Sequence, residues 1–143
     1  MSLRFKRLME EQEAFQMNAL QLAYIGDAVW DMVIRYDSVF QKFNIHHMHL
    51  HCINRVNARA QAEKLSMIRD HLTDREAEIV RRGRNTHPKH PSPRNQDPQD
   101  YTASTGFEAL LGYLYLSGQD ERVEELVNII RKQECENGNT EKT

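Results

Sequence analysis

The sequence predicts an all-α fold, a helical bundle of five to six helices. Apolar residues recur at spacings of three and four in several segments, which is typical of amphipathic helices, and no segment shows the alternation of a strand or an internal repeat. The chain has 143 residues, 39% of them hydrophobic and 28% charged, which suits one globular domain. We place this domain at residues 1–135 and expect residues 136–143 to form a disordered polar tail.

The first long helix is predicted to begin near Asn18, a favourable N-cap residue, and to fade around residues 37–40. It contains LQLAYIGDAVW at residues 20–30, an apolar run with one Gly-Asp pair in it. Asp27 lies beside the apolar stripe and shares a face with Asp31. Two such carboxylates could hold a hard cation or form a solvated helix edge. The stripe itself is expected to comprise Leu22, Ile25, Val29, Met32 and Val33.

Four histidines follow within residues 44–51, at His46, His47, His49 and His51. Their spacing is not that of ligands along one helix face, and no carboxylate is close in sequence. We therefore interpret this segment as a solvated or partner-facing loop leading into a helix, in preference to a metal site. The helix is expected to cover roughly residues 50–69, with an apolar stripe along one side.

A short helix is predicted after the capping-box pattern of Thr73 and Glu76. We expect it to end at Arg82, because Gly83 readily supplies the positive φ of a C-terminal stop. Residues 84–98 contain four prolines and are predicted to form a loop. Loops of this length are often functional.

Basic residues are concentrated around this loop. The formal net charge is −2, which taken globally argues against a nucleic-acid-binding protein, yet residues 79–96 contain five basic residues and no acid. Such a stretch on an acidic body is a plausible phosphate contact, and neutralising five phosphates would give a salt slope of about −4 to −5. A solvated surface connector is the alternative. The candidate RNA-binding residues are Arg81, Arg82, Arg84, Asn85, Lys89 and Arg94.

Glu108 is the only charged residue in the apolar run STGFEALLGYLYL at residues 104–116. Its helical neighbours are small, so another backbone could approach it closely, and the first long helix offers a matching notch at Ala23 and Gly26. If the helices pack at these notches, Asp27 meets Glu108, and the two carboxylates repel unless a cation lies between them. Magnesium suits such a site. Alternatively, each acid lies at the edge of its own helix.

The helix that carries Glu108 is predicted to start near Thr102 or Ser104 and to end at Gly118, and a last amphipathic helix to cover residues 120–133. No apolar run approaches the roughly 20 residues that span a membrane, and no signal-peptide core is visible, so we expect a cytoplasmic protein. The two cysteines, Cys52 and Cys135, have no metal-site spacing and are expected to be reduced.

Two ordered motifs carry a resemblance to a known family. IGDAV at residues 25–29, followed by TGFEALLGYLYL at residues 105–116, resembles the catalytic domain of the ribonuclease III family, and most closely its short form, Mini-ribonuclease III. The likeness extends over most of the chain, through RVNARAQAEKL at residues 55–65 and RRGRN at residues 81–85.

The acids of the family pattern are only partly present. The family has glutamates four and seven residues before its aspartate, where this chain has Ala23 and Leu20, and an aspartate three residues before its second glutamate, where this chain has Thr105. These departures are typical of the short form. Asp27 and Glu108 carry over cleanly, so the number of metal ions stays open.

The resemblance implies a metal-dependent endoribonuclease that cleaves double-stranded RNA as a homodimer, with Mg²⁺ as cofactor. Asp27 and Glu108 would be its catalytic residues and metal ligands, and a water activated by the ion would attack the phosphate, leaving 5′-phosphate and 3′-hydroxyl ends. The implied substrate is precursor 23S ribosomal RNA. Full-length ribonuclease III has a separate RNA-binding domain; we expect this chain to grip RNA with its catalytic domain alone.

Two other functions stay open. A catalytically weak RNA-binding or ribosome-assembly module would keep the fold and the dimer but bind metal poorly, because the two earlier glutamates are missing. An all-α nucleotide pyrophosphohydrolase would use a run of closely spaced acids on one helix face. The nearest approximations, at residues 10–13 and 121–125, lie away from the small-residue notches.

Overall fold

The computed structural model describes residues 8–86 and 97–137, which form seven α-helices and one 3-10 turn, without a strand in those ranges. The all-α prediction is confirmed. In chain order the elements are α1 (Glu11–Phe15), α2 (Ala19–Phe40), α3 (Ile45–Val56), α4 (Ala58–Ile68), the turn η1 (Arg69–His71), α5 (Asp74–Arg84), α6 (Pro98–Leu116) and α7 (Asp120–Asn137).

The helix count exceeds the predicted five to six for two reasons. The short α1 has too few residues to show a periodic pattern. The helix expected at residues 50–69 is divided at Asn57, which adopts an extended backbone (φ −71°, ψ 164°) and caps α4 by accepting a hydrogen bond from the Ala60 amide at 2.9 Å. Upstream, α3 begins at Ile45, so the four histidines lie on a helix, with His51 buried and its Nδ1 2.7 Å from Ser38 Oγ.

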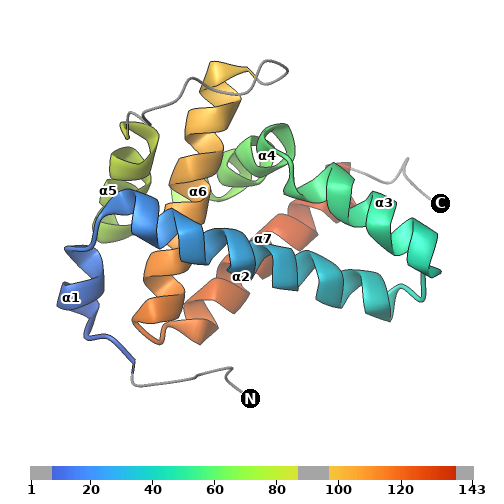
Figure 1. The fold of residues 1–143 in the computed structure, drawn as a ribbon, viewed down its shortest axis with the longest axis horizontal. Coiled ribbons are helices and arrows are strands. Elements are labelled where there is room, and N and C mark those ends of the chain that lie inside the picture. Colours follow the sequence, from blue (N-terminus) through green and yellow to red (C-terminus); the bar gives the residue numbers. More distant parts are fainter. Residues whose placement is uncertain (1–7, 87–96, 138–143) are drawn as a thin grey trace.

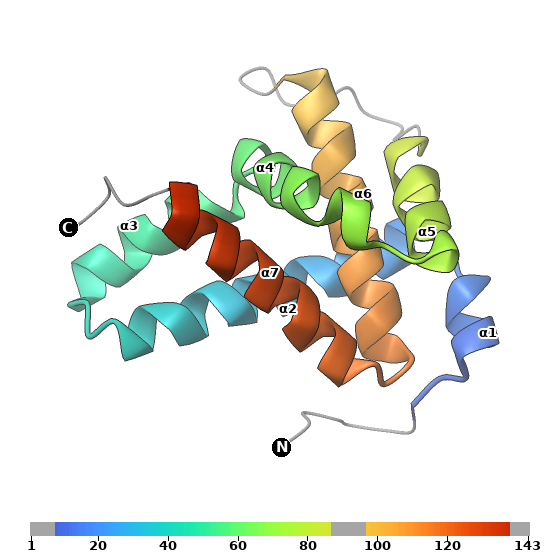
Figure 2. The same cartoon turned by 180° about the vertical axis from the view of Figure 1, so that it is seen from behind.

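The central element is α6, which α2, α4, α5 and α7 all contact (Figures 1 and 2). Ten of its 19 residues are buried, as expected for a helix that is apolar on all sides. It starts earlier than predicted, because Asp97 caps it by accepting from the Gln99 amide at 2.7 Å and Pro98 occupies the first turn, where a missing N–H costs nothing. It ends at Leu116, and Gly118 has φ +74°.

Gly83 does not end α5. The helix continues to Arg84, and Gly83 lies inside it, where an added Cβ would be 2.7 Å from Gly106 Cα. The predicted positive-φ stop is therefore wrong: the absence of a side chain serves the close packing of α5 on α6. The start of α5 is confirmed, since Thr73 and Glu76 form a complete capping box.

The buried stripe of α2 differs from the predicted one. Met32 is 57% exposed, whereas Trp30 is buried and its ring meets that of Phe107 edge to face at 5.1 Å. Trp30 Nε1 also donates to the Arg55 carbonyl at 3.0 Å, joining α2 to α3. The prediction failed because it centred the stripe on the aliphatic residues, while α6 packs against the small ones. The buried residues of α2 are Leu22, Ala23, Gly26, Trp30, Ile34 and Ser38.

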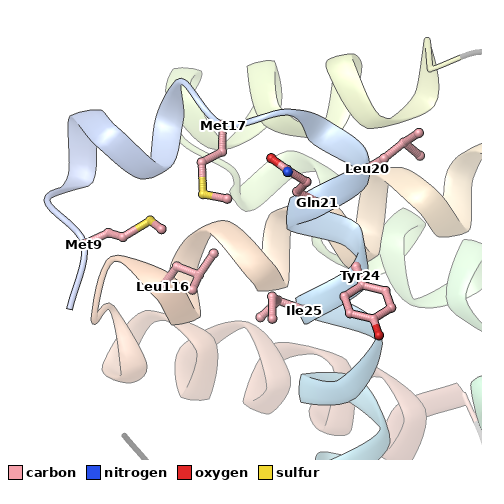
Figure 3. Close-up of a pocket in the computed structure, with 7 residues that line it drawn as sticks. All are labelled: Met9, Met17, Leu20, Gln21, Tyr24, Ile25 and Leu116. Atoms are coloured by element: carbon pink, nitrogen blue, oxygen red, sulfur yellow. The ribbon is translucent and has the colours of Figure 1, made fainter. Parts of the chain in front are cut away.

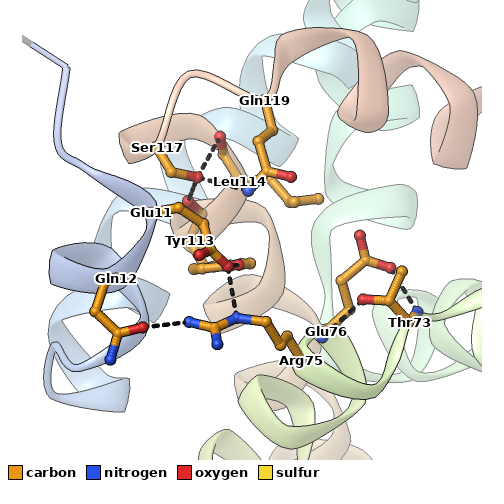
Figure 4. A network of polar contacts seen from close by, with 9 residues as sticks. All are labelled: Glu11, Gln12, Thr73, Arg75, Glu76, Tyr113, Leu114, Ser117 and Gln119. Carbon is orange, nitrogen blue, oxygen red and sulfur yellow. Dashed lines mark hydrogen bonds and ion pairs between the residues drawn. The ribbon is translucent and has the colours of Figure 1, made fainter.

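A polar network fastens α1 to the bundle (Figure 4). Arg75 of α5 donates to Glu11 at 2.6 Å and to Gln12 at 2.7 Å, and the Tyr113 hydroxyl of α6 donates to Glu11. Arg75 also lies 4.0 Å from the centre of the Phe15 ring. The short α1 is therefore held by tertiary contacts, because five residues are too few to form a stable helix alone.

None of the helices in residues 8–86 and 97–137 is long and apolar enough to cross a membrane. The last helix runs beyond its predicted end to Asn137, so Glu136 and Asn137 of the expected tail are helical, while residues 138–143 lie outside the described ranges. Cys52 and Cys135 are both free.

Candidate active site

The candidate site is built where α2 crosses α6 with the two backbones in direct contact. A Cβ added to Gly26 would lie 1.6 Å from the Glu108 carbonyl oxygen, and one added to Gly112 would lie 1.8 Å from the Leu22 carbonyl oxygen. No other residue type fits at either position. The small-residue notches of the two helices therefore do meet.

This crossing brings Asp27 and Glu108 together. Asp27 directly follows Gly26 on α2, and Glu108 is the residue of α6 whose carbonyl faces that glycine. A hydrogen bond between the two side-chain carboxyl groups contributes to the raised pKa of Glu108. Since a hydrogen bond between two carboxyl groups requires a proton on one of them, the geometry predicts that one acid of the pair is protonated when no cation is present.

The structure assigns that proton to Glu108. Burial, followed by the hydrogen bond and negative charge of Asp27, raises the pKa of Glu108 to about 8, against a small opposing effect from a hydrogen bond with Gln61. Asp27 lies at the exposed rim. The pair has one half-buried and one exposed carboxyl group, so it is open to solvent on one side, where a cation could replace the proton.

A third residue, Gln61 of α4, completes the site and was missed by sequence reasoning. Its side chain is 2% exposed, and its Nε2 donates to the Val56 carbonyl at 2.9 Å and to Glu108 Oε2 at 3.5 Å. A signal was present in the sequence, since Gln61 lies with Leu65 and Ile68 on the buried stripe of α4. A polar residue in such a stripe needs a specific partner.

The other acids near the site have separate roles. Asp31 pairs with Arg35 at 3.4 Å, and Asp97 caps α6. Thr105, which stands where the family pattern has an acid, donates its hydroxyl to the Tyr101 carbonyl at 3.1 Å. Within residues 8–86 and 97–137, no group of three or more His, Cys, Asp or Glu side chains could hold a metal ion. Asp27 and Glu108 are therefore a pair and not part of a larger acidic cluster.

Two of the candidate RNA-binding arginines are occupied by other contacts. Arg81 is paired with Glu78, one turn earlier on α5. Arg82 stacks on Phe15, its guanidinium carbon 4.4 Å from the ring centre, and its Nη2 is buried without a hydrogen-bond partner. The Arg81 guanidinium group is thus paired along the exposed side of α5, and that of Arg82 lies against α1.

Arg84 and Asn85 lie at the end of α5, where that helix packs on α6. Arg84 Cγ is the side-chain atom nearest to a Cβ built on Gly106, at 3.0 Å. At about 100° per residue, Gly106 and Glu108 project from nearly opposite sides of α6, so the basic end of α5 does not form one cluster with the carboxylates. Lys89 and Arg94 lie outside the described residues.

An exposed apolar surface runs along the outer side of α2. Tyr24 is 82% exposed, and beside it is an open apolar pocket of about 500 Å³ (Figure 3). The pocket is lined by Met9, Met17, Leu20, Gln21, Tyr24, Ile25 and Leu116. The exposed apolar residues of α2, here called the α2 stripe, are Leu20, Tyr24, Met32, Tyr36, Val39 and Phe40.

Comparison with known proteins defines the class. Residues 20–119, which hold both carboxylates and the helix crossing that joins them, match the family described as the Ribonuclease III domain. The chain belongs to the ribonuclease III family, and it is an endoribonuclease of the ribonuclease III type.

The similar relatives narrow this class to its short form. Mini-ribonuclease 3 of Symbiobacterium thermophilum is 44% identical over 109 residues, covering 76% of this chain and 83% of the relative. Mini-ribonuclease 3 of a Thermoanaerobacter species is 41% identical over 123 residues, covering 85% and 86%. A crystal structure of a Fusobacterium nucleatum protein superposes with a TM-score of 0.77 at 27% identity, covering 88% of this chain and 99% of that one. The resemblance to Mini-ribonuclease III is confirmed.

Proposed function

We propose that this endoribonuclease cleaves double-stranded RNA with Asp27 and Glu108 as catalytic residues and as ligands of Mg²⁺. The observation that carries the proposal is the contact of two carboxyl groups at the rim of the α2–α6 crossing, with a Glu108 pKa of about 8. Magnesium takes one or two carboxylates and keeps several waters, so a pair of acids is enough for it.

The roles of the two acids follow from their burial. When bound, the ion would supply charge neutralisation at the phosphate and a water with a lowered pKa. Glu108, fixed on the most buried helix, would hold the ion at a constant depth. Asp27, at the exposed rim, would face the RNA. Hydrolysis would leave 5′-phosphate and 3′-hydroxyl ends.

The RNA surface is proposed from the basic segment at the end of α5 and directly after it. Arg84 and Asn85 are its described members, and Lys89 and Arg94 are retained from the sequence. Arg81 and Arg82 would join only after leaving Glu78 and Phe15. Duplex RNA is recognised mainly by shape and through its phosphates and 2′-hydroxyls, which suits a surface of cations.

The proposed substrate is precursor 23S ribosomal RNA, and the proposed active form is a homodimer located in the cytoplasm. Two copies, each with one site, would cut the two strands of a duplex. The α2 stripe supports the dimer, because an exposed tyrosine next to an apolar pocket is self-complementary across a two-fold axis. Burying this stripe would also remove a large apolar surface from water.

The test is cleavage of a long RNA duplex in Mg²⁺ by the wild type, Asp27→Asn and Glu108→Gln, with RNA binding measured in parallel. We expect both variants to bind RNA normally and to lose more than about 100-fold in cleavage rate, since even partners of metal ligands are worth about 10- to 100-fold. Asp31→Asn is the matched control and should cleave normally, because Asp31 pairs with Arg35.

Three results would contradict the proposal. If the wild type binds the duplex and never cuts it, the chain acts as an RNA-binding or assembly module. If both variants cut as fast as the wild type, the catalytic acids lie elsewhere. If the wild type releases pyrophosphate from nucleoside triphosphates and leaves RNA intact, the pyrophosphohydrolase alternative replaces the nuclease.

A further inference from the structure

The side-chain oxygen of Gln61 is a buried hydrogen-bond acceptor that no donor reaches. In the part of the chain that the structure describes, only Gln61 Oε1 and Arg82 Nη2 are side-chain polar atoms that are both buried and unpartnered. Buried polar atoms almost always have a partner, and an exception indicates a functional role or a missing water or ion. The exception at Gln61 lies next to the proposed catalytic acids.

The orientation of this carboxamide is fixed by its own contacts. Nε2 donates to two acceptors, the Val56 carbonyl at 2.9 Å and Glu108 Oε2 at 3.5 Å. Exchanging the amide oxygen and nitrogen would place Oε1 2.9 Å from the Val56 carbonyl oxygen, with no proton between these two acceptors. Oε1 therefore cannot take the place of Nε2 to find a donor.

The carboxamide of Gln61 contacts Glu108, so a donor for Oε1 could come from the proposed cation site. Oε1 is bonded to the same carbon atom as Nε2, the nitrogen that contacts Glu108. Gln61 is 2% exposed, so bulk water does not reach this oxygen from the surface. The waters around a hydrated divalent cation are strong hydrogen-bond donors, and a neutral amide oxygen accepts from them without adding a charge.

We propose that Gln61 is a positioning residue of the nuclease site: Nε2 holds Glu108 Oε2 in place, and Oε1 accepts a hydrogen bond from the hydration shell of the divalent cation. This inference rests on the proposed metal site at Asp27 and Glu108. It adds a residue of α4 to a site that α2 and α6 otherwise form alone. It also explains why a polar residue lies in the buried stripe of α4.

A purely structural role would need only the amide nitrogen. Gln133 of α7 illustrates that role, since its Nε2 donates to the Met67 carbonyl at 2.8 Å and its half-buried side chain does not leave a sealed oxygen. Gln133 is therefore a matched control for Gln61. Both residues are glutamines whose Nε2 donates to a backbone carbonyl. Only Gln61 has a buried, unpartnered Oε1 and an acid beside it.

The test measures binding of Mn²⁺ to the RNA-free protein by electron paramagnetic resonance or calorimetry. Gln61→Glu keeps an oxygen in place of Oε1 and loses the amide donor, whereas Gln61→Met loses both. We expect Gln61→Met to raise the Kd for Mn²⁺ by about 10-fold or more and Gln133→Met to change nothing. Gln61→Glu should lose less affinity than Gln61→Met, because it keeps the oxygen but not the nitrogen that holds Glu108. Melting curves of the metal-free variants establish that each is folded.

Equal losses in Gln61→Glu and Gln61→Met would overturn the inference, because the amide nitrogen alone would then matter. Unchanged binding by Gln61→Met would overturn it as well. Asp27→Asn and Glu108→Gln separate this failure from that of the proposed function: if they too bind Mn²⁺ like the wild type, the metal site itself is wrong, whereas if they lose it, only the role of Gln61 is.

One measurement needs no substitution and applies even where a variant does not fold. In the ¹⁵N-labelled wild type, adding Mg²⁺ should shift the side-chain amide resonances of Gln61 and leave those of Gln133 in place. A Gln61 resonance that stays constant while the protein binds Mg²⁺ would contradict the proposed contact.

Discussion

The protonation of Glu108 depends on what surrounds it. Its carboxyl group is half-buried on the central helix and is affected by Asp27, so the ionised form is unfavourable. The folded pKa of about 8 compares with an unfolded value of 4.5. Folding the metal-free protein therefore binds a proton over this range of pH.

The consequence for stability is a first prediction. Below pH 4.5 both states hold the proton; above it the unfolded state ionises freely while folded Glu108 does not, so the metal-free protein should lose stability as pH rises from 4.5 to about 8. The loss is on the order of 5 kcal/mol, measured from urea denaturation midpoints in the presence of a chelator. Glu108→Gln should lack this part of the slope. Identical pH profiles for the two proteins would contradict the assigned pKa.

The glycines of the crossing provide a second prediction. Alanine at Gly26 would put a methyl group 1.6 Å from a backbone oxygen, and only separation of α2 from α6 would relieve it. We expect Gly26→Ala to cost more than about 3 kcal/mol, the upper range of overpacking. Gly83→Ala, whose Cβ would be 2.7 Å from Gly106 Cα, should cost less. Guanidinium denaturation gives both values, and the reverse order would be inconsistent with this packing.

At this scale the sequence predicts the pair of acids but not the residue between helices. Asp27 and Glu108 each stand beside small residues, and that local pattern is enough to suggest a close crossing. Gln61 is 47 residues from Glu108 in the chain, and its contact depends on how α4 packs on α6. A local sequence pattern therefore cannot predict this contact.

Among the elements, the junction of α3 and α4 depends on one asparagine. Asn57 accepts from the Ala60 amide at 2.9 Å and donates to the Ile53 and Asn54 carbonyls at 3.2 and 3.3 Å. It thus satisfies backbone groups at the end of one helix and at the start of the next. Because α4 carries Gln61, this junction also sets the third side of the site.

The third prediction concerns this junction. Asn57→Ala should cost about 1 to 2 kcal/mol, the upper half of the range for a lost N-cap, because bonds to α3 are lost with it. Asn44→Ala, which removes a cap that serves α3 alone, is the matched comparison and should cost about 1 kcal/mol or less. Urea titration of both variants measures the two losses of stability. A smaller loss in Asn57→Ala than in Asn44→Ala would argue against the role of Asn57 in both helices.

The sequence predicts a helix boundary correctly where a capping motif marks it. It fails where a residue such as proline or glycine can either end a helix or lie within one. The capping box of Thr73 was visible in the sequence and is present. Pro98 was assigned to the loop although proline also fits the first turn of a helix. Gly83 was assigned a stop although glycine also permits close packing. Only the neighbouring helix decides between these uses.

At the scale of the whole molecule, the α2 stripe is an apolar surface that stays exposed to solvent in a single copy of the chain. Its members follow one another along the outer side of a 22-residue helix, opposite the face that packs on α6. The sequence does not distinguish this stripe from the face of α2 that packs on α6, because both are apolar. A helix of this kind is typically buried twice, once in its own domain and once in an interface.

Dimer formation is the subject of the fourth prediction. Tyr24→Asp should place a charge in the apolar contact and shift the protein toward the monomer, whereas Tyr24→Phe should remain dimeric. Light scattering coupled to size-exclusion chromatography measures the mass of each. Both variants should melt close to the wild-type monomer, since Tyr24 is 82% exposed. A monomeric wild type would contradict the proposed dimer, and a dimeric Tyr24→Asp would place the interface away from this stripe.

The backbone contact between Gly26 and Glu108 also determines when Asp27 and Glu108 can come together during synthesis of the chain. Asp27 is translated early, but its partner lies on a helix encoded much later, and closing so long a loop is slow and entropically costly. An unfinished chain on the ribosome therefore has no pair of acids. If the proposed nuclease acts through this pair, a nascent copy cannot cleave RNA before α6 has been synthesised and has packed on α2.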